Sequence, residues 1–334
     1  MKKKTLLTIV QYLFFFGLGA LLIKWQYGKL TPADRDQIYV AFSQVKERLW
    51  LLIPVIVIGF LSHWFRALRW KILLEPVNLK PHTTNVTFAV LIGYLVNLLL
   101  PRMGEVARCS VLAKYEKEPV DKIIGTIVAE RSFDLLCLVI VSILTYVLQM
   151  RVANSYVERQ LEALNFNGQT TFVIILGIVL FIALLIFIYR RAKRTKLGSI
   201  IKGLGEGVMS IFKMKKRTAF LIYTVLIWMC YLSLIVIGFK AIDATQHLGY
   251  LAGLSVLVFG SLGMIVTPGG IGAYPIAVQG VLVSVYGINK NFALAFGWIS
   301  WMAQTAVILI LGLVSLLLLP IYNARIKQNR LDNK

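Results

Sequence analysis

The sequence predicts an all-α integral membrane protein with about six full transmembrane helices and two re-entrant pairs of broken helices in an inverted-repeat arrangement. Three observations lead to this fold class. Hydrophobic residues make up 58% of the 334 residues and charged residues only 15%, whereas a soluble domain has about 45–50% and about 25%. The apolar residues form runs long enough to cross a bilayer. Two of these runs are interrupted by helix breakers, around Pro101 and Pro268.

The apolar runs define the expected elements of a single polytopic domain, 1–334. They cover about 5–25, 50–66, 84–100, 123–149, 171–189, 218–240, 249–267, 275–287 and 291–319. The first run follows Lys2-Lys3-Lys4, but its length and its lack of a small-residue cleavage site favour a retained helix over a signal peptide. The segment 33–49 mixes charged and apolar residues and predicts either an interfacial amphipathic helix on the outer face or a helical linker.

The distribution of Lys and Arg predicts the orientation, because these residues are in excess in short cytoplasmic loops. The N-terminal lysines, the segment 190–217 with ten basic residues against Glu206, and the basic tail 320–334 are expected in the cytoplasm. The protein is therefore expected in the inner (plasma) membrane with both termini cytoplasmic. Since the net charge of +21 follows from these flanking residues, nucleic acid is not an expected partner.

Counting crossings predicts the two re-entrant pairs. The run 84–100 begins and ends on the cytoplasmic side, so it is expected to break at Pro101 and return through about 104–113. The segment 249–287 begins and ends outside, so it is expected to be two short helices that meet at the second break. The chain then divides into halves, about 5–149 and 171–319, and three crossings invert the second half. Such symmetry is typical of alternating-access membrane proteins.

Ionisable residues in or beside these runs are candidate functional residues, since each costs roughly 2.5–3.5 kcal/mol at a helix centre unless it is paired or faces a polar cavity. They are Arg102, Glu105, Arg108, Glu130, Arg131 and Asp134. Helical spacing places Glu130 and Asp134 on one face and Arg131 elsewhere. Arg102 or Arg108 is expected to pair with one of these two acids. Two interpretations stay open: a vestibule that offers an arginine to a lipid phosphate, and a closed ion-pair network that pins the hairpin to its neighbour.

Two further arginines close the second span. Arg66 and Arg69, with Trp70 and Lys71, are expected to anchor this helix at the inner interface. Contact with a lipid headgroup is the alternative.

The second break predicts a hinge and a backbone anion site. Gly269, Gly270 and Gly272, after Pro268, allow positive φ, and a half-helix from about Ala273 would direct its N–H groups into the protein centre. Two polar side chains are candidates to join this site, Gln279 and Gln304. Ordinary interhelical hydrogen bonding is the favoured interpretation for both.

No catalytic or metal-binding pattern is visible, so no cofactor and no metal is expected. The three histidines and three cysteines are scattered, without ligand spacing: His63, His82, His247, Cys109, Cys137 and Cys230. No nucleotide-binding motif is present.

Four motifs in order resemble the lysylphosphatidylglycerol synthase/flippase transmembrane family over about residues 5–320. They are Arg66-Ala67-Leu68-Arg69-Trp70, Asn97 to Glu105 with Pro101-Arg102, Glu130-Arg131-Ser132-Phe133-Asp134, and Pro268-Gly269-Gly270-Ile271-Gly272. The resemblance implies a domain that translocates aminoacylated or other modified phospholipids. Bifunctional members add a C-terminal aminoacyl transferase domain, which is not expected here because the sequence ends at Lys334. Related sequences often continue the glycine turn into an acidic residue, and Tyr274-Pro275 here argues against a cationic aminoacyl headgroup.

The expected function is flippase-like movement of a phospholipid, with an anionic or modified headgroup, across the inner membrane. A separate lipid-modifying enzyme is left open as the source of the substrate. One alternative is an intramembrane transferase, or an accessory subunit, acting on polyprenyl-linked or glycolipid substrates. Its general base would be Glu105, Glu130 or Asp134. The other alternative is a scaffold that merely packs against a partner.

Overall fold

The computed structural model describes residues 17–100, 103–149, 211 and 214–332. The chain divides into two compact units, Met1–Ile127 with Lys216–Lys334, and Val128–Lys215. Several predictions concern residues outside the described ranges: the start of the run 5–25, the break residues Pro101 and Arg102, the span 171–189, and most of the segment 190–217.

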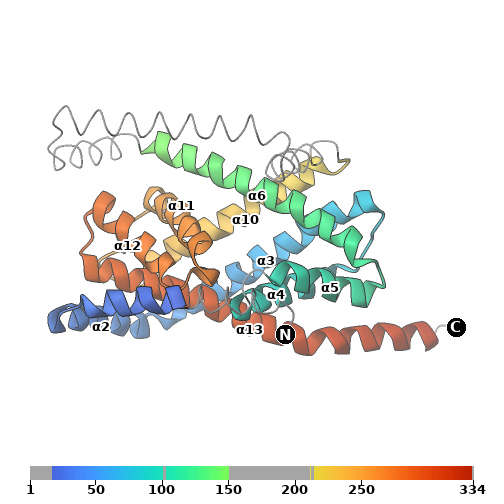
Figure 1. Ribbon diagram of the computed structural model, residues 1–334, viewed down its shortest axis with the longest axis horizontal. Helices are drawn as coiled ribbons and strands as arrows, with labels where there is room; N and C mark the ends of the chain where they lie inside the picture. The colour runs from blue at the N-terminus through green and yellow to red at the C-terminus, as the bar shows by residue number, and fades with distance from the viewer. Residues whose placement is uncertain (1–16, 101–102, 150–210, 212–213, 333–334) are drawn as a thin grey trace. The chain divides into compact units, whose positions relative to one another are not determined.

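The described chain is helical, with no strand in the ranges given above (Figure 1). The helices are α2 (Pro32–Glu47), α3 (Leu52–Leu74), α4 (Thr83–Leu99), α5 (Gly104–Glu116), α6 (Val120–Leu148), α10 (Arg217–Phe239), α11 (Tyr250–Val266), α12 (Ala273–Tyr286) and α13 (Lys290–Asp332). Three short 3-10 helices adjoin these: η1 (Leu49–Leu51) before α3, η2 (Glu75–Val77) after α3 and η3 (Pro268–Gly270) after α11. Residues 17–28 are also helical. Both predicted breaks therefore separate two helices, as expected.

Helix α2 shows how the sequence starts a helix outside the apolar runs. Thr31 is its N-cap and forms a capping box with Asp34, and Pro32 occupies the first helical position, where its missing N–H costs nothing. The segment 33–49 is thus a helix, whichever of the two predicted roles it has. Its far end is tied to the α10–α11 connection, where Gln44 donates to Asp243 (2.9 Å) and Arg48 forms an ion pair with the same carboxylate.

The first unit is built around two long helices, α3 and α10, which lie side by side and share the most extensive helix–helix interface among the described residues (Figure 1). α13 packs against α4, α12 and α2. Large side chains fill the space between α10 and α13, where the Phe239 and Phe296 rings stack with centroids 5.0 Å apart and both are fully buried. Gly312 of α13 lies so close to α4 that an added Cβ would be 2.6 Å from Leu95 Cβ.

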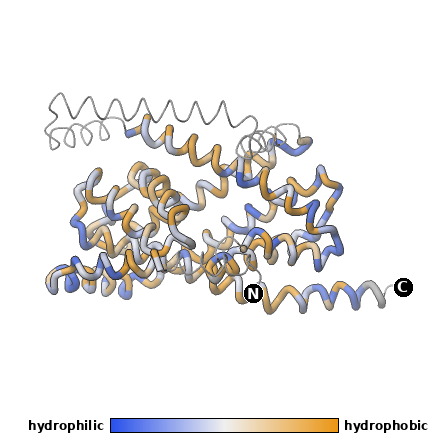
Figure 2. The backbone as a smooth tube through the Cα atoms, in the orientation of Figure 1, coloured by the Kyte–Doolittle hydropathy of each residue, from blue (hydrophilic) through white to orange (hydrophobic). Residues whose placement is uncertain are grey.

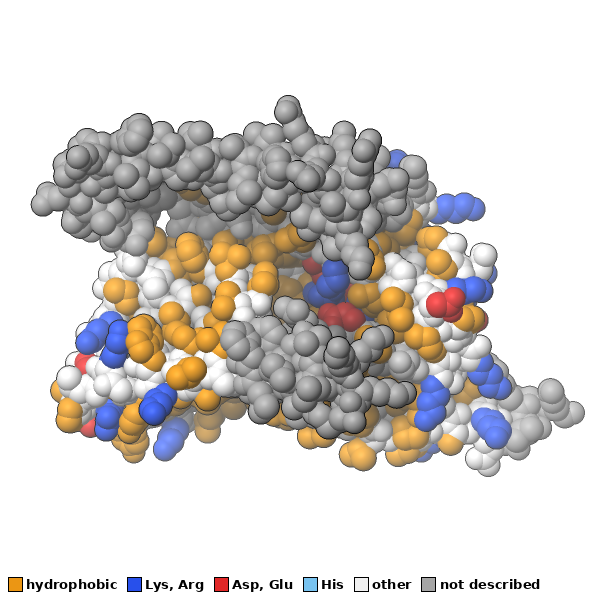
Figure 3. Space-filling model, in the orientation of Figure 1, with side chains coloured by type: hydrophobic (Ala, Val, Ile, Leu, Met, Phe, Trp, Pro, Cys, Tyr) orange, Lys and Arg blue, Asp and Glu red, His pale blue; other side chains and the backbone are white. Residues whose placement is uncertain are grey.

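Three described stretches are long and apolar enough to cross a membrane: Leu49–Val77, Arg217–Phe239 and Lys290–Asn329. Figure 2 shows a long hydrophobic stretch along α13. Large apolar side chains are exposed on these helices, such as Ile53 (68%) and Leu317 (69%), as expected for surfaces that face lipid. On the face in Figure 3, hydrophobic side chains are widespread among the described residues, most Lys and Arg side chains lie toward the edges of the view, and a cluster of basic and acidic side chains lies near its centre. The count of six spans stays a prediction.

The basic tail 320–334 continues the last span as helix. α13 begins at Lys290 and runs without interruption to Asp332. Pro320 lies inside the helix, and half of the twelve helical residues after it, including Ala324, Arg325 and Lys327, are strong helix formers. At 1.5 Å per residue, the 43 residues of α13 extend about 65 Å, roughly twice the hydrocarbon thickness. Part of α13 therefore lies outside any bilayer that it crosses.

Candidate functional site

The first break is a tight helical hairpin. α4 ends at Leu99, Leu100 is extended, and α5 begins at Gly104. The Gly104 N–H donates to Asn97 Oδ1 (2.9 Å), so the last turn of α4 caps the start of α5. A Cβ at Gly104 would lie 2.3 Å from the Gly93 carbonyl oxygen. Only glycine allows α5 to return so closely along α4.

Side chains of α13 form hydrogen bonds to the second break. Gly269 has φ of +63° and Gly270 has φ of +73°, a region that side chains with a Cβ rarely adopt. Trp301 Nε1 donates to the Gly269 carbonyl (2.7 Å), and one turn later Gln304 donates to the Tyr274 hydroxyl (3.2 Å). These two bonds satisfy polar groups on both sides of the break, as irregular backbone within a membrane requires.

The two breaks meet inside the first unit. α4 contacts η3, and Leu98 Cδ2 lies 3.8 Å from the position that a Cβ would take at Gly269. The tip of the α4–α5 hairpin therefore touches the tip of the α11–α12 turn, although the two are far apart in the sequence. Binding sites of transporters with inverted repeats form at such a meeting of discontinuous helices.

Three buried arginines lie in the same unit. The exposed fractions of Arg66, Arg69 and Arg108 are 5%, 0% and 4%. Arg66 donates to the Tyr231 hydroxyl (3.0 Å), and Arg69 donates to Thr224 Oγ1 (3.4 Å). These contacts place both side chains between α3 and α10, and their predicted position at the inner interface of the membrane remains a prediction.

Aromatic faces accompany each of these guanidinium groups, at distances typical of cation–π contacts. Arg108 lies 4.6 Å from the Trp70 ring centroid, Arg69 lies 5.4 Å from that of Phe220, and Arg66 lies 5.7 Å from that of Tyr94. Trp70 in turn donates to Thr126 Oγ1 (2.9 Å) at the start of α6. The arginine side chains are thus held in place by surrounding helices, which positions their charge.

In the second unit, three predicted site residues form one ion-pair group on α6. Arg131 Nη2 lies 3.3 Å from Glu130 Oε1, and its Nη1 lies 3.8 Å from Asp134 Oδ2. The Glu130 side chain is fully buried, whereas 41% of the Arg131 side chain is exposed. Helical spacing puts Arg131 on a different side of α6 from both acids, but its long side chain bends back to the preceding residue and along to the next turn, so that it reaches both of them.

The predicted partners of these acids remain predictions. Arg102 lies outside the described residues, and Arg108 belongs to the other unit. Glu105 lies in the first turn of α5 and is half-buried.

The predicted backbone anion site at the start of α12 also remains a prediction. The backbone there is enclosed: a Cβ at Gly272 would lie 3.0 Å from Leu22 Cβ. Gln279 does not lie at the break, because it donates to the carbonyl of Lys290 (2.9 Å) at the α12–α13 connection. Gln304 does reach the second break. Both glutamines make the interhelical contacts that the sequence favoured.

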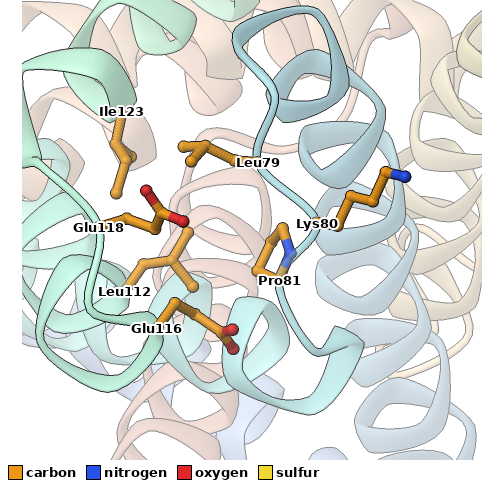
Figure 4. A pocket seen from close by; sticks show the side chains of 7 residues that line it. All are labelled: Leu79, Lys80, Pro81, Leu112, Glu116, Glu118 and Ile123. Atoms are coloured by element: carbon orange, nitrogen blue, oxygen red, sulfur yellow. The ribbon is translucent and has the colours of Figure 1, made fainter.

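A small pocket lies elsewhere in the first unit, at the ends of its helices. It is lined by Leu79, Lys80, Pro81, Leu112, Glu116, Glu118 and Ile123. Figure 4 shows the Glu118 carboxylate between the apolar side chains and Lys80 pointing away. Glu116 already accepts from the His82 N–H (3.0 Å) and from Asn85 (2.7 Å). Among the described residues, no group of three His, Cys, Asp or Glu is placed to hold a metal ion.

Sequence reasoning missed the residues that hold the site together, chiefly Asn97, Trp301 and Tyr231. One signal was available for Trp301. Tryptophan in a membrane helix favours the interface, and Trp301 lies well inside the α13 apolar run, where its N–H needs an acceptor.

Long apolar helices, two breaks that meet and buried arginines define this protein as a polytopic α-helical membrane protein. The chain belongs to the family described as the lysylphosphatidylglycerol synthase TM region, whose model matches residues 8–328. Neither the curated proteins nor the solved structures compared with the chain include a match. Family membership indicates a function related to membrane lipids.

Proposed function

We propose that this protein is a flippase-like membrane protein that moves a phospholipid, or another lipid-linked headgroup, across the inner membrane. The observation that carries the proposal is the meeting of the two broken helices at Leu98 and Gly269. A headgroup needs a polar path while its acyl chains stay in lipid, and irregular backbone at membrane depth supplies polar groups only where protein or a cavity encloses it.

The proposed topology has six full spans and two re-entrant hairpins in inverted halves, with both termini cytoplasmic. Two contacts support it. α3 packs against α10, and the first hairpin meets the second. Under the proposed division, α3 and α10 are equivalent helices of the two halves, and the hairpins are likewise equivalent. Contact between equivalent elements is what a pseudo-two-fold axis in the membrane plane produces.

The proposed substrate contacts are arginines, because a guanidinium group binds phosphate oxygens in a bidentate manner. Arg66 and Arg69 would contact the phosphate from the first unit. Of the residues predicted from the sequence to form an inner vestibule, Glu105 and Arg108 lie in the first unit, and Glu130, Arg131 and Asp134 lie in the second. Pro268, Gly269, Gly270 and Gly272 would form the outer hinge. The expected partners are phospholipids with an anionic or modified headgroup.

Headgroup movement in proteoliposomes tests the proposal. The protein would be reconstituted with fluorescent anionic, zwitterionic and aminoacylated phospholipids, and their accessibility to a membrane-impermeant quencher followed over time. We expect wild-type protein to accelerate exposure of at least one lipid and Arg66→Gln to abolish the acceleration. Arg325→Gln, at an exposed position of α13, is the matched control and should retain activity.

One result would contradict transport, and another would contradict the proposed role of Arg66. If no lipid moves with the wild-type protein, the transferase alternative takes over, and Glu105→Gln, Glu130→Gln and Asp134→Gln should then abolish turnover on polyprenyl-linked sugars. If lipid moves equally with Arg66→Gln and wild type, the buried arginine is not on the path.

A further inference from the structure

We infer that His63 is a ligand-binding residue whose Nδ1 atom donates a hydrogen bond to the phosphate of the transported lipid, beside Arg66. This inference rests on the proposed function and names the chemical group that is recognised at mid-membrane depth.

His63 lies at the midpoint of α3. The 23 residues of this helix extend about 34 Å, close to the hydrocarbon thickness of a bilayer. A residue at the midpoint of such a span lies near the centre of the membrane. Ionisable side chains at this depth are rare and mark functional positions.

The side chain of His63 continues a row of buried basic groups. His63, Arg66 and Arg69 follow one another at intervals of three residues, so they occupy one side of α3. Their exposed fractions are 7%, 5% and 0%. The row runs from the C-terminal part of α3 to its middle, and it provides successive positions for one negatively charged group.

The groups around His63 are rich in hydrogen-bond donors. Its ring lies 4.5 Å from the Tyr94 ring of α4. One turn along α3, Arg66 contacts both Tyr94 and the Tyr231 hydroxyl of α10. Guanidinium groups only donate hydrogen bonds, so a ligand here must accept them. A phosphate has several acceptor oxygens, whereas an ammonium headgroup has none and would be repelled by Arg66.

One polar atom of this set has no protein partner. His63 Nδ1 is buried and makes no hydrogen bond within the described part of the chain. Such an atom is unfavourable in a protein interior, and a phosphate oxygen would satisfy it. The tautomer with the proton on Nδ1 makes this bond, and Arg66 contributes the charge.

The test measures binding separately from transport. The full-length protein in detergent would be titrated with phosphatidylglycerol, diacylglycerol and undecaprenyl phosphate, with binding followed by native mass spectrometry. The variants are His63→Phe, His63→Asn and His63→Gln, because the asparagine amide superimposes on Nδ1 and the glutamine amide on Nε2. His247→Phe, at an exposed position, is the matched control.

We expect phosphatidylglycerol to bind at least tenfold more tightly than diacylglycerol. His63→Phe and His63→Gln should lose most of this preference, while His63→Asn and His247→Phe should stay within about twofold of wild type. If the protein instead binds undecaprenyl phosphate more tightly than phosphatidylglycerol, with the same dependence on His63, the phosphate site is supported. The phosphate group then comes from a polyprenyl carrier rather than from a phospholipid.

Three results would overturn the inference. The first is equal affinity of wild type and His63→Phe for phosphatidylglycerol, and the second is equal affinity of wild type for phosphatidylglycerol and diacylglycerol. The third is a preference for phosphatidylglycerol that His63→Gln keeps and His63→Asn loses. Failure of the proposed function looks different. In that case the binding pattern holds, but no lipid crosses the proteoliposome membrane.

Discussion

At the scale of single residues, Asp34 shows how one carboxylate joins two distant parts of the chain. It accepts from the Thr31 N–H (2.9 Å) and from Asn291 Nδ2 (2.7 Å), and Lys290 Nζ lies 3.5 Å away. The backbone bond from Thr31, followed by the Asn291 side chain, lowers the pKa of Asp34 well below its ordinary value. The start of α2 is thereby fixed to the start of α13.

Asp34→Asn is expected to lower the thermal stability of the protein at pH 7. Because the folded-state pKa is depressed, the stabilisation by Asp34 is fully present above its ordinary pKa of about 3.9 and is lost as pH falls toward the folded-state value. The difference in melting temperature between wild type and Asp34→Asn should therefore shrink below about pH 4. Tryptophan fluorescence during heating in detergent measures it.

Asp36→Asn is the control for this prediction, since Asp36 lies on the same helix but is exposed. Asp36→Asn should have the same melting temperature as wild type at pH 7 and below about pH 4. A difference between wild type and Asp34→Asn that stays constant from pH 7 to pH 3 would contradict the assignment.

At the scale of elements, the two hairpins show what local sequence predicts well. Proline and glycine act on their own backbone, so the breaks at Pro101 and Pro268 and the restart of helix near Ala273 follow from a few adjacent residues. How closely the second helix of each hairpin packs along the first does not follow from local sequence. It depends on Gly93 facing Gly104, and on Gly263 facing Tyr274 Cα, 2.8 Å from where a Cβ would lie. Spacing alone does not tell which glycines face each other.

Gly104→Ala is expected to destabilise the first hairpin, because its Cβ would overlap the Gly93 carbonyl. Forcing an extra carbon into a packed contact costs about 1–3 kcal/mol, and here the obstacle is backbone, which cannot rotate away. Thermal unfolding in detergent should show a lower midpoint, and headgroup movement should fall with it.

Gly125→Ala provides the comparison. Nothing lies within 4 Å of an added Cβ at this exposed helical position, and alanine favours helix by about 1 kcal/mol over glycine. This variant should be as stable as wild type or more so. Equal stability of Gly104→Ala and Gly125→Ala would show that the hairpin does not depend on the close approach.

At the scale of the whole molecule, the proposed inverted topology places the ends of each hairpin on one side of the membrane. The first hairpin begins after the turn at Asn78 and ends near Lys117, both with positive φ. The second begins after Gln246 and ends at Asn289. Basic residues flank the first pair of connections, so these should be cytoplasmic.

Single cysteines test this arrangement. Cysteine at 78 and at 117 should react with a membrane-impermeant maleimide only from the cytoplasmic side, and cysteine at 246 and at 289 only from the outside. The three native cysteines would first be replaced by serine. Labelling of 78 and 117 from opposite sides would mean that α4 and α5 together cross the membrane, and the inverted topology would be wrong.

The sequence by itself determined the membrane class, the apolar helices and the positions of both breaks. These follow from bilayer thickness and from the backbone limits of proline and glycine, which act over a few residues. Only the tertiary structure decided that Leu98 meets Gly269, that Trp301 holds the second break, and that Arg66 is buried against Tyr231. Each of these contacts joins residues on different helices, and which helix faces meet depends on the packing of all the helices together.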